Sequence, residues 1–128
     1  MWTRDVGSLA TAAVLLAACG RSPTTAPPRP TQIIRPIQVD SVQVRVQASQ
    51  VSVHVRGVIG DGCTELSGTS MSRADASVHI QILSQRPAEA ICTQIARLYD
   101  ETLRVPGDFA PGHYALSVNS VETTFDVP

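Results

Sequence analysis

The sequence predicts an all-β protein whose folded part is a sandwich of seven antiparallel strands. Beyond residue 36, apolar and polar residues alternate with a period close to two, which is typical of strands with one buried face. Runs of this kind recur at short spacing along the remaining 92 residues. About ninety residues divided among seven short strands is the size of a β-sandwich domain.

The first nineteen residues depart from this pattern and predict an export signal. They begin with Arg4 and Asp5 and continue with an uncharged run over residues 6–18. This run is too short to cross a bilayer, because a spanning helix needs about 20 apolar residues. A short apolar run after a start that carries positive charge is typical of a secretory signal peptide.

The end of this run, Leu16-Ala17-Ala18-Cys19, resembles the lipobox of bacterial lipoprotein signal peptides. The resemblance implies that Cys19 is acylated and becomes the new N-terminus, so that the protein is attached to a membrane through lipid. It also implies a place on the extracytoplasmic face of the envelope. Glycine at position 20, where aspartate would favour the inner membrane, implies the outer membrane in a Gram-negative cell. The alternative is an uncleaved helix with an incidental cysteine.

Residues 20–36 predict a linker, because they hold five of the nine prolines and no acidic residue. Proline-rich chain is extended at about 3.1 Å per residue, so seventeen residues reach roughly 50 Å. The linker carries three arginines, whereas residues 37–128 carry six arginines and ten acids, a net charge of −4. We interpret the linker as a solvated spacer, with contact between its arginines and anionic lipid as the alternative.

The expected strands follow the alternation in chain order. They cover residues 42–46, 51–55, 64–71 (the weakest run), 78–82, 99–105, 114–118 and 123–127. Their alternating positions are Val42, Val44 and Val46; Val51, Val53 and Val55; Val78, Ile80 and Ile82; Tyr99, Leu103 and Val105; Tyr114, Leu116 and Val118; and Thr123, Phe125 and Val127. Residues 87–98 are ambiguous, and we expect mainly a loop with at most one helical turn.

The stretch from Phe109 to Leu116, FAPGHYAL, resembles the corner before the penultimate strand of bacterial immunoglobulin-like domains. The resemblance implies an immunoglobulin-like sandwich in which the Tyr114 hydroxyl bonds to backbone upstream. Asn119-Ser120 then forms a two-residue hairpin turn. The chain departs from antibody-type domains because Leu116 replaces the second core cysteine and no tryptophan follows the signal. Segments 61–64 and 92–94 also resemble short, uncharacterised bacterial secreted domains, which implies no activity.

With Cys19 assigned to lipid, Cys63 and Cys92 remain as an even pair in an exported chain, and we expect them to form a disulfide. No C-x-x-C or zinc-ligand spacing is present. In immunoglobulin order the two cysteine loops share one end of the sandwich, and the loops around Ser49, Ala74 and Asp108 lie at the other. The candidate binding surface at the cysteine end consists of Asp61, Thr64, Glu65, Arg86, Glu89, Gln94 and Asn119.

The composition excludes several kinds of chemistry. There is no lysine, which rules out a P-loop lysine, a Schiff base and a Ser-Lys dyad. There is no basic cluster for nucleic acid, and neither a cofactor nor a small-molecule substrate is indicated. His54, His79 and His113 lack a ligand pattern, so neither a metal nor a catalytic role is expected. Asp100 and Glu101 point to opposite faces of a strand, and a calcium site from Asp61, Glu65 and Asp108 would join opposite ends.

We therefore expect no catalytic residues and no enzyme. The leading hypothesis is a lipid-anchored immunoglobulin-like module that acts by protein contact, in adhesion or envelope assembly, on an unidentified envelope or surface protein. The alternative is an extracytoplasmic peptidase inhibitor that uses the disulfide-pinned loops as a rigid wedge, since preorganisation lowers the entropic cost of binding. A small hydrolase is least favoured, because no nucleophile with a positioned base is evident.

Overall fold

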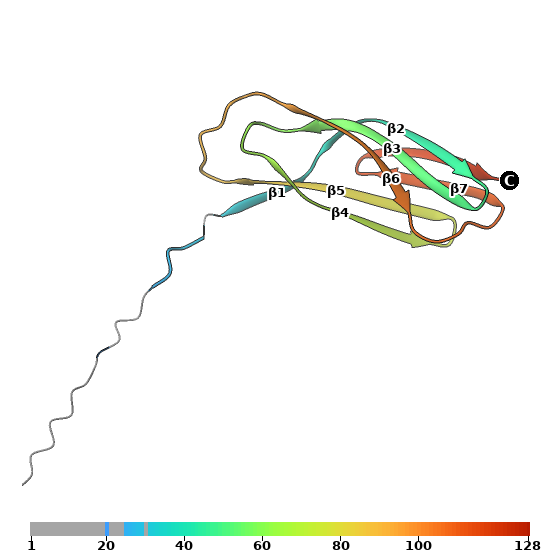
Figure 1. Ribbon diagram of the computed structural model, residues 1–128, viewed down its shortest axis with the longest axis horizontal. Helices are drawn as coiled ribbons and strands as arrows, with labels where there is room; N and C mark the ends of the chain where they lie inside the picture. Colours follow the sequence, from blue (N-terminus) through green and yellow to red (C-terminus); the bar gives the residue numbers. More distant parts are fainter. Residues whose placement is uncertain (1–19, 21–24, 30) are drawn as a thin grey trace, which may run out of the picture.

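The structure, a computed structural model, describes residues 20, 25–29 and 31–128. The described residues form an all-β sandwich without helix, which confirms the predicted fold class (Figure 1). The described residues contain eight strands where seven were expected. They are β1 (Gln32–Pro36), β2 (Gln38–Gln47), β3 (Gln50–Ile59), β4 (Glu65–Ala74), β5 (Ser77–Pro87), β6 (Arg97–Val105), β7 (Gly112–Val118) and β8 (Val121–Val127).

The additional strand, β1, corrects the linker boundary that composition placed at residue 36. Residues 32–36 pair in antiparallel register with the end of β5, Gln32 opposite Pro87 and Pro36 opposite Leu83. Proline fits at the end of such an edge strand, where no ladder donor is needed from its nitrogen. Cys19, the export signal and part of the spacer lie outside the described residues. No helix long and apolar enough to be a membrane span occurs in the part of the chain that the structure describes.

The two sheets differ in width and in strand direction. One sheet contains β2, β3 and β6 in that order, and the other contains β4, β5, β7 and β8, with β1 also paired to β5. The same edge of β5 binds β7 over Ser77–Ile80 and β1 over residues 83–87. The β5–β7 pair is parallel, so the all-antiparallel arrangement that the immunoglobulin resemblance implied is wrong at this position.

The core lies between the sheets and contains the alternating residues that the sequence singled out. Val53, Val55, Ile82 and Val118 have no exposed surface. An aromatic cluster closes the end opposite the cysteines, where the rings of Phe109 and Phe125 pack against Tyr114. The Tyr114 hydroxyl donates to the carbonyl of Ala110 at 2.8 Å, which is the hydrogen bond that a tyrosine corner requires. Residues 88–96 form a loop and contain no helical turn.

Candidate functional site

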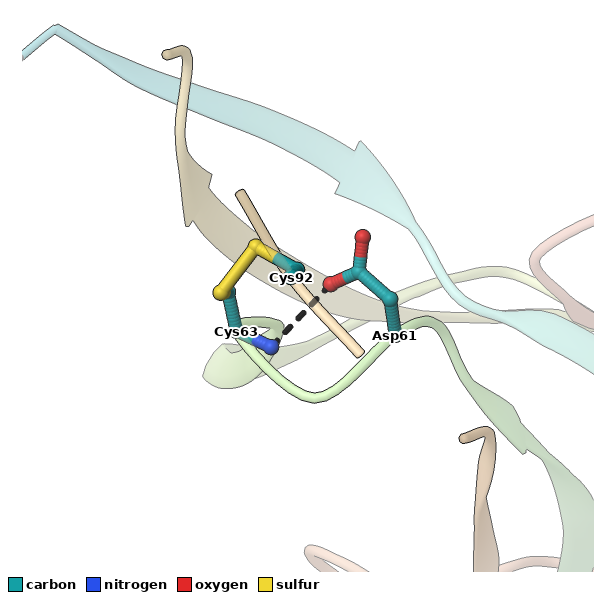
Figure 2. A group of neighbouring side chains, drawn as sticks. All are labelled: Asp61, Cys63 and Cys92. Carbon is teal, nitrogen blue, oxygen red and sulfur yellow. Dashed lines mark hydrogen bonds between the residues drawn. A yellow bond between two sulfur atoms is a disulfide. The ribbon is translucent and has the colours of Figure 1, made fainter. Parts of the chain in front are cut away.

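The disulfide end is built from the turn between β3 and β4 and the loop between β5 and β6. A Cys63–Cys92 disulfide joins them, with Cα atoms 5.5 Å apart, which confirms the predicted bond (Figure 2). The backbone N–H of Gly62 also donates to the carbonyl of Thr93 at 2.9 Å. A Cβ at position 62 would lie 2.1 Å from the Thr93 hydroxyl, so any larger residue there requires this hydroxyl to rotate away. We call this region the pinned end.

Asp61 organises the turn from within. One carboxylate oxygen accepts from the Cys63 backbone N–H at 3.1 Å and from the Thr64 hydroxyl at 2.8 Å (Figure 2 shows the bond to Cys63). The other oxygen binds Nη1 of Arg86 at 2.8 Å. This is the turn geometry that an aspartate followed by a threonine three residues later favours. The carboxylate thereby connects the β3–β4 turn to the end of β5.

The pKa of Asp61 is lowered from its ordinary value. The hydrogen bond from the Thr64 hydroxyl is the largest cause, and burial opposes it. The Cys63 N–H and the positive charge of Arg86 lower the pKa further. The carboxylate is therefore charged at neutral pH and serves as a fixed structural anion, because its oxygens are committed to neighbours rather than to a ligand.

This lowered pKa predicts acid sensitivity. Because the pKa of Asp61 is lower in the folded chain than in the unfolded chain, its stabilising effect is complete above the unfolded value and is lost as pH falls through the folded value. Asp61→Asn is expected to be less stable than the wild type at neutral pH and to lose less stability as the pH falls below the ordinary pKa of an aspartate. Urea denaturation at a series of pH values measures this. Asp75→Asn, in the turn at the other end, is the control, and parallel curves for Asp61→Asn and wild type would contradict the role.

Two arginines complete the pinned end. Besides its ion pair, Arg86 donates through Nη2 to the carbonyl of Ala90 at 3.4 Å and lies 3.5 Å from the sulfur of Cys92. Its Nε is buried and has no hydrogen-bond partner among the described residues. Arg97, at the start of β6, donates to the carbonyl of Thr64. An open cavity of about 340 Å³ between β1 and the end of β3 borders the Asp61–Arg86 pair.

The structure brings only part of the expected binding surface together. Asp61, Thr64 and Arg86 converge, and Thr64 is buried. Glu65, Glu89 and Gln94 are exposed around them. Asn119 does not belong to this surface, because β7 is aligned with the first half of β5 and ends opposite Ile80. Its side chain instead bonds to backbone of Ile82 and Ile37 within the fold.

The remaining candidate residues have local partners. His54 lies 2.6 Å from Asp100, His79 lies 2.7 Å from Ser117, and His113 lies 2.7 Å from Asp126. Asp108 accepts from the Ser49 hydroxyl at the end opposite the cysteines, so it cannot share a calcium ion with Asp61. Potential ligand atoms of Asp61, Cys63 and Cys92 lie within 4.8 Å of one another. Disulfide sulfurs are not thiolates, however, so this group does not offer the ligands that zinc prefers.

Sequence reasoning missed the apolar character of this end. The large apolar side chains that are exposed in the described part of the chain come from β1, the start of β4, the loop before β6 and the start of β6. They are Ile34, Leu66, Ile91, Ile95 and Leu98. Ile91, next to Cys92, is 103% exposed, and Ile95 is 70% exposed. Period-two analysis could not identify them, since the loop that carries two of them has no regular period.

Comparison with known proteins gives a family without an assigned activity. The family model of the ORF11 beta-sandwich domain matches residues 53–127. An uncharacterised 10.2 kDa protein in the HgiCIIM 5′ region of Herpetosiphon aurantiacus is 31% identical over 88 residues, which cover 66% of this chain and 94% of that relative. A similar protein in the HgiBIM 5′ region of the same organism is 32% identical over 72 residues, covering 56% of this chain and 88% of the relative. No solved structure matches the chain.

Proposed function

The chain belongs to the ORF11 beta-sandwich domain family, and from this premise we propose that it is a lipid-anchored, non-enzymatic module that contacts another protein of the bacterial envelope. The observation that carries the proposal is the pinned end, where exposed apolar side chains stand on loops held by a disulfide and an ion pair. Holding loops in one conformation before binding reduces the entropy lost on association. Ile91 and Ile95 are the central contacts.

The path of the chain supports the anchor. The lipobox-like Leu16–Cys19 segment precedes β1, and β1 begins opposite Pro87, at the pinned end. Twelve residues separate Cys19 from Gln32, and a fully extended proline-rich spacer of that length reaches about 37 Å. The anchor would hold the domain on the extracytoplasmic face of the membrane, which is the outer membrane in a Gram-negative cell.

The anchor is tested by intact mass spectrometry of the protein extracted from membranes. We expect a chain that begins at Cys19 and carries two or three acyl groups, with two fewer hydrogens for the Cys63–Cys92 disulfide. Cys19→Ala should lack the acyl groups. A wild-type protein that begins at Met1 without added lipid contradicts the anchor, and so does a Cys19→Ala protein that carries the same added mass.

The contact surface is tested by photo-crosslinking in cells. A photoreactive amino acid in place of Ile91 should give one discrete adduct, whereas the same group in place of Asp75, at the other end, should give none. Ile95→Asp, combined with the probe at position 91, should reduce the adduct at least about tenfold, because a charge does not fit an apolar contact. Equal amounts of adduct from probes at positions 91 and 75 would contradict the assignment of the contact surface to the pinned end.

A peptidase inhibitor is the second candidate, and the exposed loop at residues 88–96 favours it. The loop presents Ile91 beside a disulfide, and so offers an aliphatic side chain in a fixed conformation. In this case the adduct at position 91 is a peptidase, and the purified chain inhibits that enzyme with Ile91→Asp as the inactive control. A peptidase that remains fully active with excess chain rules this function out.

A further inference from the structure

The two sheets of the sandwich do not cover each other completely. β2 contacts β8 along one side of the molecule. Counting inward from that side, β3 faces β7 and β6 faces β5. In the part of the chain that the structure describes, the three-stranded sheet has no fourth strand to face β4. Figure 1 shows β4 along the lower margin, outside β6. The residues of β4 are accordingly exposed, apart from a half-buried Met71.

The inner face of β4 is nevertheless directed toward the core layer. Thr69 and Met71 pair with Ile82 and Ile80, two core residues of β5. Paired residues of an antiparallel ladder point to the same face, so these side chains lie on the interior side. Leu66, opposite the buried Ser84, is on this side too and remains 45% exposed. On this interior side Leu66 and Met71 are therefore open to solvent, whereas Thr69 bonds to Tyr99 of β6 and the guanidinium of Arg73, opposite Val78, covers the Phe109 ring.

The edge strand next to the inner face of β4 is β6, and its outer edge pairs with no strand among the described residues. Such an edge presents free backbone N–H and C=O groups to a further strand. Its residue Glu101 is opposite Val55, whose side chain is completely buried, so Glu101 lies on the interior side. Within the described chain, Glu101 forms no ion pair. An inward-facing charge prevents indiscriminate pairing and sets a requirement for a specific partner.

We propose that β6 and the inner face of β4 form a slot that accepts one extended segment of another polypeptide. The segment adds to the free edge of β6 as a fourth strand and covers β4. Its inward side chains alternate with outward ones: apolar residues pack against Met71 and Leu103, and an arginine or lysine pairs with Glu101. Backbone hydrogen bonds supply affinity, and the inward residues supply specificity. This inference requires neither the lipid anchor nor a partner at the pinned end.

The geometry excludes antiparallel pairing of β6 with the β6 of a second copy. Such pairing would place both five-stranded sheets on the same side of the joined sheet. Because β4 extends one strand beyond β6, the β4 of the copy would fall where β5 already lies. A single strand has no second layer and enters without this overlap. An isolated extended segment is therefore the occupant to which the proposal commits.

The proposal is tested by joining a candidate strand to the full chain. The strand Thr-Val-Thr-Val-Thr-Arg-Thr-Ala-Thr, placed after Pro128 on a Gly/Ser linker of about 30 residues with a mean span of about 30 Å, puts arginine opposite Glu101 in antiparallel register. Linkage gives the appended strand a millimolar effective concentration, so that even weak binding to β6 becomes measurable. We expect the Tm to rise by about 4–8 °C, and hydrogen exchange of β6 amides to slow at least about tenfold.

Two controls test the charge pairing. Replacing the arginine of the appended strand with glutamate should abolish the Tm increase. In a chain with Glu101→Arg, the glutamate strand should stabilise and the arginine strand should not. Equal effects of both strands on the wild type overturn the proposal, as does no effect of either strand. New protection at the outer edge of β4, β2 or β8 instead of β6 also overturns it.

Discussion

Replacing Cys63 and Cys92 together with serine is expected to lower the free energy of unfolding by about 3.6 kcal/mol. The bond closes a loop with a sequence separation of 29 residues, and its loss restores conformational freedom to the unfolded chain. Domains of this size have a free energy of unfolding of about 5–15 kcal/mol, so the expected loss is a large fraction of the total. Urea denaturation of the full chain measures it as a lower midpoint.

The wild-type protein under reducing conditions is the matched control and should lose a similar amount of stability. The Asp61–Arg86 ion pair and the Gly62–Thr93 hydrogen bond remain in both cases, so the loops stay adjacent in the native state. A midpoint in the double variant equal to that of the oxidised wild type would contradict the estimate. It would mean that these noncovalent contacts already hold the unfolded chain compact.

The sequence was sufficient to predict the disulfide and most of the strands. Three cysteines in a chain with a lipobox-like segment leave one pair, and the loops that carry the pair do lie together. Alternation identified Val53, Ile82 and Val118 as core residues because a period of two determines which side chains share a buried face. The Tyr114 corner was identifiable because its hydrogen bond is local, four residues upstream.

Strand neighbours could not be derived in the same way. Alternation specifies a face, but it does not specify which edge pairs with which. The parallel β5–β7 pair and the division of one β5 edge between β7 and β1 were therefore missed. β1 is only five residues long and ends in proline, so composition grouped it with the spacer. The slot between β6 and β4 follows from the unequal widths of the sheets, a property of pairing rather than of any single strand.

For the same reason, only part of the candidate site could be predicted from the sequence. The Asp61–Thr64 turn has a local signal in its spacing, but the ion pair with Arg86 joins residues on different elements. The sequence placed Asn119 on the candidate surface because, in immunoglobulin order, the Asn119-Ser120 hairpin falls at the same end of the sandwich as the cysteine loops. The turn itself is present, with Val118 opposite Val121. What the sequence did not show is that this turn meets the middle of β5.

Asn119→Ala is accordingly expected to destabilise the fold by about 2–4 kcal/mol rather than to change a binding surface. The Asn119 carbonyl oxygen accepts from the N–H of Ile82 at 2.8 Å, and its amide nitrogen donates to the carbonyls of Ile37 at 2.9 Å and Ile82 at 3.1 Å. The side chain thus completes the ladder where β5 changes partner from β7 to β1. Alanine leaves these backbone groups without the amide, and a half-buried site does not fully hydrate them.

Asn119→Gly distinguishes the contribution of the turn conformation to stability from that of the side-chain hydrogen bonds. Asn119 has a φ of 51°, a conformation that costs alanine about 1 kcal/mol more than glycine. If the amide bonds are the main contribution, the glycine variant should still lose at least about 1.5 kcal/mol in urea denaturation. Hydrogen exchange should also accelerate at Ile82 before the rest of β5. A glycine variant as stable as wild type would show instead that Asn119 serves only the turn, because the hydrogen bonds would then be replaced by water without loss.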